Sequence, residues 1–188
     1  MRRKKYDDID IKIISELQKN GRAKILELAR KLNLTHPSVH ERLKKLFKED
    51  IMKIQADINV CKLRLKAVFI NAEVKNPSAV AKFIEKCNKC GKLVLVGFGS
   101  GEYNLFIIFV GNDLSELRAM IEKNLRSDPD VNKINVSFGE IIYPKYLPVK
   151  VDSDYEHMAK EICTNCDFFR SKMCRGCAAI ISCIKSLS

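Results

Sequence analysis

Long apolar runs are absent from this 188-residue chain. The longest ones, at residues 105–110 and 178–184, fall far below the roughly 20 residues that a membrane-spanning helix requires. The basic N-terminus MRRKKYDDID has no apolar segment behind it, which tells against a secretory signal. We therefore expect a cytoplasmic protein with no membrane partner.

Glutamine is scarce, with two residues, and acidic side chains are outnumbered by basic ones, 23 to 34. The excess of basic charge lies at the N-terminus, because residues 1–54 carry 15 basic and 8 acidic side chains while residues 151–188 carry five of each. A basic segment of this kind indicates a polyanionic partner, either nucleic acid or an anionic membrane surface. A Lys-rich, Gln-poor composition is also common in thermophiles, so charge alone leaves both explanations open.

The composition, 46% hydrophobic and 30% charged, excludes wholesale disorder. The length fits two compact units with an appendage. In the first unit, apolar residues recur at helical spacing in three short segments, which begin at Asp8, near Lys24 and after Thr35. Asp7 or Asp8 can cap the first helix, and Asn20 with Gly21 ends it. The expected inward positions are Ile9, Ile13, Ile14, Leu17, Ile25, Leu28, Ala29, Leu32, Val39, Leu43, Leu46 and Phe47.

Three short helices with a tight turn before the last form a helix-turn-helix, whose last helix enters the major groove of DNA. The start of that helix combines a positive dipole end with short polar side chains, and cations follow it. The predicted DNA contacts are Thr35, His36, Ser38, His40, Glu41, Arg42, Lys44 and Lys45. A protein-interaction module with a solvated basic face is the alternative. His36 and His40, one helical turn apart, are also a candidate pair of metal ligands.

The middle of the chain reads as a strand at 52–59 followed by a β-α-β-β-α-β series. Its elements are expected at residues 65–75, 77–87, 93–98, 103–110, 114–125 and 131–142. This order defines a ferredoxin-like sandwich, so we expect an α+β protein. The apolar run 105–110 predicts a buried central strand.

A glycine-rich run, residues 97–104, lies between two of these strands. Glycines there let backbone donors approach a ligand carboxylate. The predicted effector-binding residues are Gly99, Ser100, Gly101, Tyr103 and Asn104. The run is not a dinucleotide fingerprint, because no helix follows to receive a pyrophosphate. A glycine-rich hairpin without a ligand remains the alternative.

The cysteines are clustered, with five of the eight in the last 26 residues. Two C-x-x-C pairs separated by seven residues suit tetrahedral Zn²⁺, and metal binding would supply folding energy to so short a tail. The predicted zinc ligands are Cys163, Cys166, Cys174 and Cys177, with Cys183 and His157 as spare candidates. An iron-sulfur cluster, and a disulfide or free thiols, are the alternatives.

The other three cysteines lie in the middle of the chain. Cys87 and Cys90 form a lone C-x-x-C at the end of a helix. Buried thiols that pack are the favoured interpretation of this pair, ahead of a redox pair or half of a metal site. We expect Cys61 to pack as well.

The run YDDIDIKIISELQKNGRAKILELARKLNLTHPSVHERLKKLFKEDIMK resembles the DNA-binding domain of the Lrp/AsnC (leucine-responsive, feast/famine) transcription regulators. The shared features are a D-x-D-x-x-I-L-x-x-L-type first helix, N-G-R-A after it, L-A-x-x-L in the second helix and an L-S-x-x-x-V-x-x-R-x-x-x-L pattern across the third. The resemblance covers about residues 6–145 and does not explain the tail. It implies a winged helix-turn-helix domain, an effector such as an amino acid, and a homodimer that can assemble into a tetramer or octamer.

Two residues depart from the family pattern. Asp50 stands where the family usually has glycine at the end of the third helix. If the chain makes a left-handed turn there, Asp50 must adopt the left-handed backbone conformation. Asn104 stands where the family's T-G-x-Y-D loop has Asp. The loss of that charge predicts a ligand other than a plain amino acid, or no ligand.

The expected organisation is a helix-turn-helix domain at 1–54, a linker strand at 55–63, an effector-binding and dimerisation domain at 64–147 and a cysteine-rich extension at 148–188. We expect a sequence-specific transcription regulator that binds double-stranded DNA and is not an enzyme. The tetrapyrrole-processing sirohaem decarboxylases, which share the layout, are a rival class. They are disfavoured because all three histidines lie outside the expected sandwich. A zinc-containing protein adaptor is the other rival.

Overall fold

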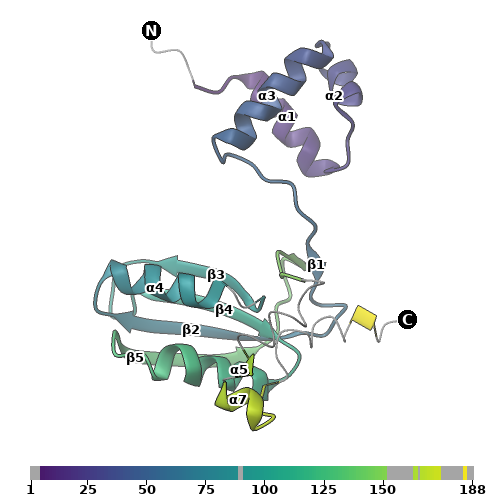
Figure 1. The fold of residues 1–188 in the computed structure, drawn as a ribbon. Helices are drawn as coiled ribbons and strands as arrows, with labels where there is room; N and C mark the ends of the chain where they lie inside the picture. Colours follow the sequence, from purple (N-terminus) through teal and green to yellow (C-terminus); the bar gives the residue numbers. More distant parts are fainter. Residues whose placement is uncertain (1–4, 89–90, 152–162, 165, 175–183, 186–188) are drawn as a thin grey trace. The chain divides into compact units, whose positions relative to one another are not determined.

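The structure is a computed structural model that describes residues 5–88, 91–151, 163–164, 166–174 and 184–185 (Figure 1). The chain divides into two compact units, residues 1–56 and residues 57–188. None of the helices within the described ranges is long and apolar enough to cross a membrane.

The N-terminal unit contains three helices, α1 (Asp8–Lys19), α2 (Ile25–Leu32) and α3 (His36–Lys48). Asp7 rather than Asp8 caps α1, since its carboxylate accepts hydrogen bonds from the backbone N–H groups of Ile9 and Asp10. Thr35 caps α3 as expected. The buried core consists of Ile13, Leu17, Leu28, Ala29, Val39, Leu43 and Leu46. Phe47 was expected to join this core, but its side chain is 42% exposed, so that prediction is wrong.

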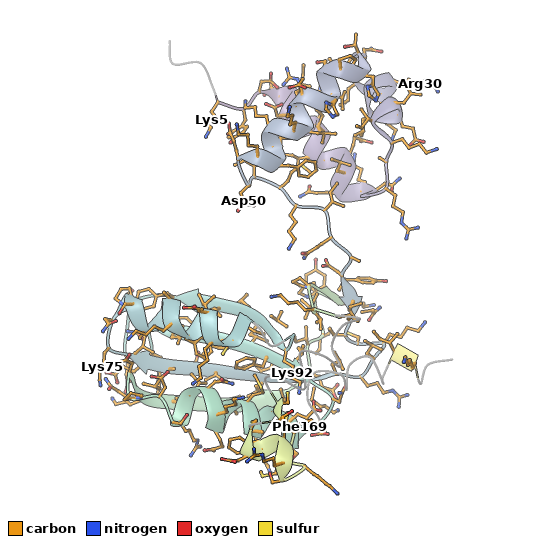
Figure 2. The ribbon with its side chains drawn as sticks, in the orientation of Figure 1. Lys5, Arg30, Asp50, Lys75, Lys92 and Phe169 are labelled. Atoms are coloured by element: carbon orange, nitrogen blue, oxygen red, sulfur yellow. The ribbon has the colours of Figure 1, made fainter. Side chains whose placement is uncertain are left out.

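The backbone after α3 takes the left-handed conformation predicted for Asp50, whose φ is 54° (Figure 2). The expected strand at 52–59 is wrong except at its end, where β1 (Ile58–Asn59) pairs with β6 (Tyr146–Leu147). Residues 5–56 therefore contain no strand, and the prediction of a winged domain is wrong for the described part of this unit. A wing needs paired strands, and β1, the first strand after α3 in the described part of the chain, lies with its partner β6 in the second unit.

The second unit contains the β-α-β-β-α-β series that the sequence predicts. Its elements are β2 (Lys66–Val74), α4 (Pro77–Asn88), β3 (Leu93–Phe98), β4 (Leu105–Gly111), α5 (Leu114–Ile121), the π-helical turn η1 (Glu122–Arg126) and β5 (Val131–Gly139). The strands form an antiparallel sheet in the order β3-β4-β2-β5, so β4 is central as expected. The fold is a ferredoxin-like sandwich.

Helices α4 and α5 cover the same side of this sheet (Figure 1). Their apolar side chains join those of β2 and β4 that point toward them, including Ile70, Ile107 and Phe109, in one core. The opposite side carries Phe69, Leu95, Phe106 and Ile108, which we call the open sheet face. Leu95 is 47% exposed and Phe106 is 41% exposed. A second, smaller core under β1 and β6 includes the partly buried Phe69.

Part of the C-terminal extension lies within the described residues. A short helix, α7 (Asp167–Arg170), lies between two of the cysteines.

Candidate DNA-binding and effector sites

Helix α3 presents a polar surface because three apolar side chains hold its other side. Val39, Leu43 and Leu46 are buried and, at helical spacing, fix which residues face outward. Five predicted DNA contacts are exposed, namely Thr35, His36, His40, Glu41 and Lys44. Lys48, one turn further along, is exposed as well. The rings of His36 and His40 stack with centroids 6.5 Å apart and an interplanar angle of 8°.

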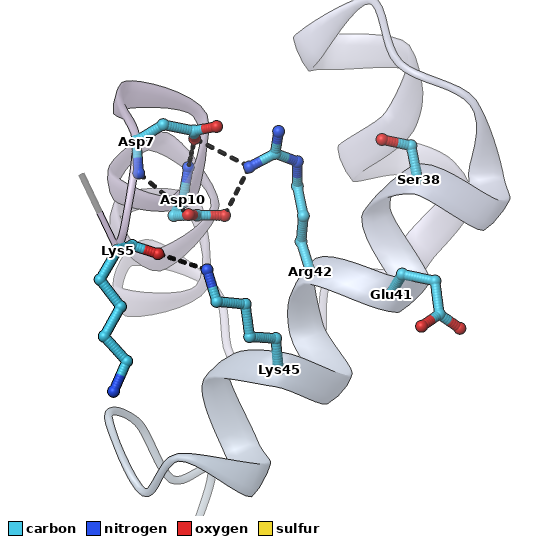
Figure 3. A pocket seen from close by; sticks show the side chains of 7 residues that line it. All are labelled: Lys5, Asp7, Asp10, Ser38, Glu41, Arg42 and Lys45. Atoms are coloured by element: carbon cyan, nitrogen blue, oxygen red, sulfur yellow. Dashed lines mark hydrogen bonds and ion pairs between the residues drawn. The ribbon is translucent and has the colours of Figure 1, made fainter. Parts of the chain in front are cut away.

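Arg42 is oriented differently from these residues (Figure 3). Its Nη1 atom lies 2.7 Å from Oδ1 of Asp10 and 2.8 Å from Oδ1 of Asp7, at the start of α1. The Asp10 side chain is 3% exposed, so its charge depends on this guanidinium for compensation. The backbone N–H of Asp10 and then Arg42 lower the pKa of Asp7. Arg42 therefore joins α3 to the capping box of α1.

Lys45 also contacts the start of the chain. Its Nζ atom donates to the backbone carbonyl of Lys5 and lies 4.8 Å from the centroid of the Tyr6 ring. The Tyr6 hydroxyl donates to Glu49 and so lowers the pKa of that carboxyl. Residues 5–7 are thus attached to α3 at several points.

Between α1 and α3 lies a surface hollow of about 420 Å³. Its lining residues, drawn in Figure 3, are Lys5, Asp7, Asp10, Ser38, Glu41, Arg42 and Lys45. Three predicted DNA contacts, Ser38, Arg42 and Lys45, are partly buried here rather than exposed. The pairing of Asp10 with Arg42 was not predicted from the sequence. The D-x-D pattern of the first helix, Asp8 and Asp10, could have indicated a functional carboxylate. The pattern does not identify the cation with which Asp10 pairs.

The glycine-rich run forms the hairpin loop between β3 and β4, as predicted. Asn104 at its end is anchored to β2, since its Oδ1 accepts from Val74 N at 2.8 Å and its Nδ2 donates to Val74 O at 2.9 Å. The backbone N–H of Gly99 donates to the carbonyl of Asn104 across the loop at 2.8 Å. Gly101 has a φ of +122°, a conformation that favours glycine. The Asn104 amide thus serves as donor and acceptor within the chain, a pairing that a carboxylate could not make.

A hollow of about 510 Å³ lies beside this loop. It is lined by Glu73, Val74, Lys75, Gly101, Glu102, Asn104, Asn132 and Lys133. Of the predicted effector residues, Gly101 and Asn104 line it, while Gly99, Ser100 and Tyr103 do not. The Nζ atom of Lys133 lies 3.2 Å from Glu102 and 3.7 Å from Glu73, and Glu102 is the main cause of the raised pKa of Lys133.

Three of the four predicted zinc ligands are described, and Cys163, Cys166 and Cys174 are all partly buried. Cys177 and the spare candidates Cys183 and His157 lie outside the described residues. Within the described ranges, no group of three or more His, Cys, Asp or Glu side chains is arranged to hold a metal ion. Burial opposes the thiolate of Cys166, but hydrogen bonds from the backbone of Phe169 and Phe168 outweigh it and lower the pKa of that thiol.

The cysteines in the middle of the chain, Cys61, Cys87 and Cys90, differ in burial where the structure describes them. Cys87 is buried in the sandwich core, and burial raises its pKa to about 12, which agrees with a packing role. Cys90 lies outside the described residues. Cys61 is exposed and its Sγ donates to the carbonyl of Ile141 at 3.1 Å, so the prediction that it packs in a core is wrong. Its segment lies at the margin of the small core rather than inside it.

A three-helix unit whose third helix carries exposed polar residues, followed by a ferredoxin-like sandwich, is the layout of two-domain helix-turn-helix transcription regulators, although that layout alone does not separate them from the sirohaem decarboxylases. Comparison with known proteins gives the family. The AsnC-type helix-turn-helix domain matches residues 7–46. The chain is 30% identical over 129 residues to the HTH-type transcriptional regulator PH0140 of Pyrococcus horikoshii, a match that covers 68% of this chain and 82% of that protein.

Two further comparisons agree. The chain is 30% identical over 155 residues to the leucine-responsive regulatory protein of Haemophilus influenzae, covering 79% of this chain and 93% of that protein. The crystal structure of the transcriptional regulator NMB0573 of Neisseria meningitidis in complex with L-Met is similar, with a TM-score of 0.60, 25% identity and coverage of 78% of this chain and 96% of that one. This chain belongs to the Lrp/AsnC family of transcription regulators. It is a helix-turn-helix transcriptional regulator, as the sequence predicts.

Proposed function

We propose that the protein binds its operator through the exposed residues of α3, with His36, His40 and Lys44 at the centre of the contact. The observation that carries this proposal is that all three side chains are exposed and lie four residues apart along α3, whose apolar residues Val39 and Leu43 are buried. Side chains at this spacing lie on one strip of a helix, as a helix in the major groove requires. In the same strip Lys48 supplies charge for phosphates.

The experiment is selection of bound duplexes from a random DNA pool, followed by affinity measurements at several salt concentrations. Lys44→Ala should weaken binding to all sequences and reduce the slope of log affinity against log salt by about one, because one phosphate contact is lost. Lys82→Ala, which removes an exposed lysine from α4, is the control and should change neither quantity. An unchanged salt slope in folded Lys44→Ala protein would show that α3 does not contact the phosphates there.

We also propose that two copies of the chain associate through the open sheet face. Leu95 and Phe106 are exposed on the side of the sheet that the helices leave uncovered, next to the partly buried Phe69 and Ile108, and an exposed apolar surface favours association. A dimer presents two reading helices, so the operator should contain two half-sites about 10 bp apart or a multiple of that. Assembly into tetramers or octamers is part of the same proposal.

The hollow beside the β3–β4 loop is the proposed effector site. The Neisseria relative holds L-Met, which supports a small amino acid or related metabolite as the ligand class. In this chain Lys75 and Lys133 supply positive charge and Glu73 and Glu102 negative charge at the hollow. Calorimetric titration with the twenty common amino acids tests this proposal, and the absence of binding by all of them would favour a different metabolite or a hairpin without a ligand.

The cysteine-rich extension is the proposed metal site, with Cys163, Cys166, Cys174 and Cys177 as thiolate ligands of one Zn²⁺ per chain. The spacing of the two C-x-x-C pairs supports the proposal, and zinc is bound by four thiolates in structural sites. Elemental analysis of purified protein tests it. Iron with inorganic sulfide would replace zinc with a cluster, and metal-free protein with oxidised cysteines would refute both.

These assignments describe a cytoplasmic, non-enzymatic regulator whose DNA affinity responds to a metabolite, to the metal or to the redox state of the tail. The names of the relatives support a regulator over a sirohaem decarboxylase or a zinc adaptor. Footprinting with and without a chelator would show whether the tail affects DNA binding.

A further inference from the structure

One acidic side chain lies among the exposed cations of α3. Glu41 is two residues from both Val39 and Leu43, and two steps of about 100° along a helix turn it away from these buried residues. Its side chain is 70% exposed. Lys44 and Lys48, three and seven residues further along, are exposed on the same part of the helix. Glu41 therefore lies within the surface that is proposed to meet the operator.

The carboxylate of Glu41 is not paired with the lysines next to it. A lysine four residues after a glutamate is well placed for an ion pair within a helix. Lys45 occupies that position, but its Nζ atom donates to the backbone carbonyl of Lys5 and lies 4.8 Å from the centroid of the Tyr6 ring. In Figure 3 the Glu41 carboxylate points away from Lys45. The second unusual feature of Glu41 is thus the loss of its expected partner to the start of the chain.

A histidine supplies the charged contact that Glu41 does have within the described residues. The Nδ1 atom of His40 lies 3.5 Å from Oε1 of Glu41, and the His40 side chain is 55% exposed. This distance is longer than a normal hydrogen bond, so both carboxylate oxygens keep their capacity to accept. The contact favours one side of the helix for the carboxylate without satisfying it.

A carboxylate at this position has a cost and little structural benefit. It repels the phosphates of any duplex that α3 approaches. Its contact with His40 is exposed, and exposed ion pairs contribute little to stability. Neither the stability of α3 nor general affinity for DNA therefore explains Glu41, whereas recognition of a base does.

The chemistry of a carboxylate restricts which base it can recognise, because an ionised carboxylate only accepts hydrogen bonds. In the major groove guanine presents two acceptors, and thymine presents an acceptor beside a methyl group. Adenine presents a donor, but an acceptor lies next to it. Cytosine presents its N4 amino group as a donor without an adjacent acceptor. Cytosine is therefore the base that suits Glu41 best.

We propose that Glu41 is a specificity-determining residue, whose carboxylate accepts a hydrogen bond from the N4 amino group of a cytosine in the operator. The inference rests on the proposed contact between α3 and the operator. On other sequences the carboxylate meets no donor and repels the phosphates, so binding there is weakened. Glu41 thus raises the ratio of operator affinity to affinity for other DNA, which decides how well a site is found among many competitors.

The test compares wild-type protein with Glu41→Gln by selection of bound duplexes from a random pool. The wild type should select a site in which one position is occupied by cytosine. In Glu41→Gln the preference for cytosine at that position should fall about 10-fold and shift toward adenine, because a glutamine amide pairs with N6 and N7 of adenine. Affinity for a duplex without the site should rise by up to about fivefold, since the repulsion is removed.

Two further variants separate the base contact from the charge and from the fold. Glu41→Asp keeps the charge but is one methylene shorter, so it should lose the cytosine preference without gaining affinity for other DNA. Glu85→Gln makes the same charge change on the exposed part of α4 and should retain both properties of the wild type. Because Glu41 is exposed, we expect its variants to fold, and thermal unfolding checks this.

The outcomes distinguish this inference from the contact on which it rests. A reduced salt slope in Lys44→Ala together with wild-type base preferences in Glu41→Gln would overturn the role of Glu41 and leave the α3 contact standing. Selection of a site without a cytosine preference by the wild type would overturn that role as well. An unchanged salt slope in folded Lys44→Ala protein would refute the α3 contact and this inference together.

Discussion

Arg42 shows how the same side chain can be assigned differently from sequence and from structure. Helical spacing predicts that Arg42 faces outward with the other cations of α3. In the structure its guanidinium forms ion pairs with Asp7 and Asp10. The choice depends on a carboxylate 32 residues away in the sequence. Spacing within α3 carries no information about that partner.

We predict that Arg42→Ala lowers the stability of the N-terminal unit by about 2 kcal/mol, because the buried Asp10 carboxylate loses its partner. DNA affinity should fall through the misplacement of α3, while the salt slope stays within experimental error of the wild type. Thermal unfolding and salt-dependent binding measure the two effects. Lys44→Ala should show the opposite pattern, and a reduced salt slope with unchanged stability in Arg42→Ala would assign Arg42 to the phosphates instead.

Asn104 illustrates a departure from the family pattern with a structural cause. Its amide pairs with both backbone groups of Val74, so Asn104→Asp, which restores the family's residue, removes a donor and places a carboxylate near the Val74 carbonyl. We expect a loss of about 1–2 kcal/mol, measured by denaturant unfolding. Asn135→Asp, on exposed β5, is the control and should have little effect. Equal stability of both variants would mean that the Val74 contact is dispensable.

At the scale of elements, α1 and α2 are joined by a small charge network. Glu16 accepts from Lys31 at 2.7 Å and from Lys19 at 2.9 Å, and these hydrogen bonds, that from Lys31 first, lower its pKa to about 2. The pair Glu16–Lys31 connects two helices, whereas Glu16–Lys19 lies within α1. A pattern of charges along one helix predicts only the second contact.

The depressed pKa of Glu16 predicts a pH dependence with a defined sign. Since the pKa is about 2 in the folded protein against the ordinary value of 4.5, the stabilisation is present above about pH 4.5 and is lost as the pH falls toward 2. Thermal unfolding between pH 6 and pH 2.5 should show a smaller acid-induced loss in Glu16→Gln than in the wild type. Glu85→Gln, on α4, makes the same charge change as a control, and a wild-type acid response in Glu16→Gln would contradict the prediction.

At the scale of the whole molecule, the proposed association through the open sheet face would set how many reading helices meet the DNA. We predict that Phe106→Lys converts the protein to a monomer at micromolar concentration, because it places a charge in the proposed interface of two open sheet faces. Sedimentation velocity measures the mass, and footprinting should show the loss of paired half-sites. Ile84→Lys changes another exposed apolar residue, 40% exposed on α4, and should remain a dimer. A dimeric Phe106→Lys protein would place the interface elsewhere.

The sequence by itself determined the local elements and their order. Helical periodicity predicted α1, α2 and α3, the succession of expected strands and helices predicted the β-α-β-β-α-β series, and the family resemblance assigned a left-handed backbone to Asp50. These features depend on residues only a few positions apart, so they can be predicted from the order of residues alone. The predicted family and its regulator function followed from motifs of the same local kind.

Only the tertiary structure decided which partners distant residues take. Of the strand expected at 52–59 only two residues form a strand, because strand formation requires a neighbour, and Leu147, the partner of Ile58, is 89 residues further along the chain. Arg42 forms an ion pair with Asp10, and the Asn104 amide forms hydrogen bonds with the backbone of Val74. Lys92 contacts both Glu116 and Cys174. Each of these choices pairs a charge or an amide with a group far away in sequence. The free energy of burying a polar group depends on the partner that the fold supplies, and residue spacing cannot identify that partner.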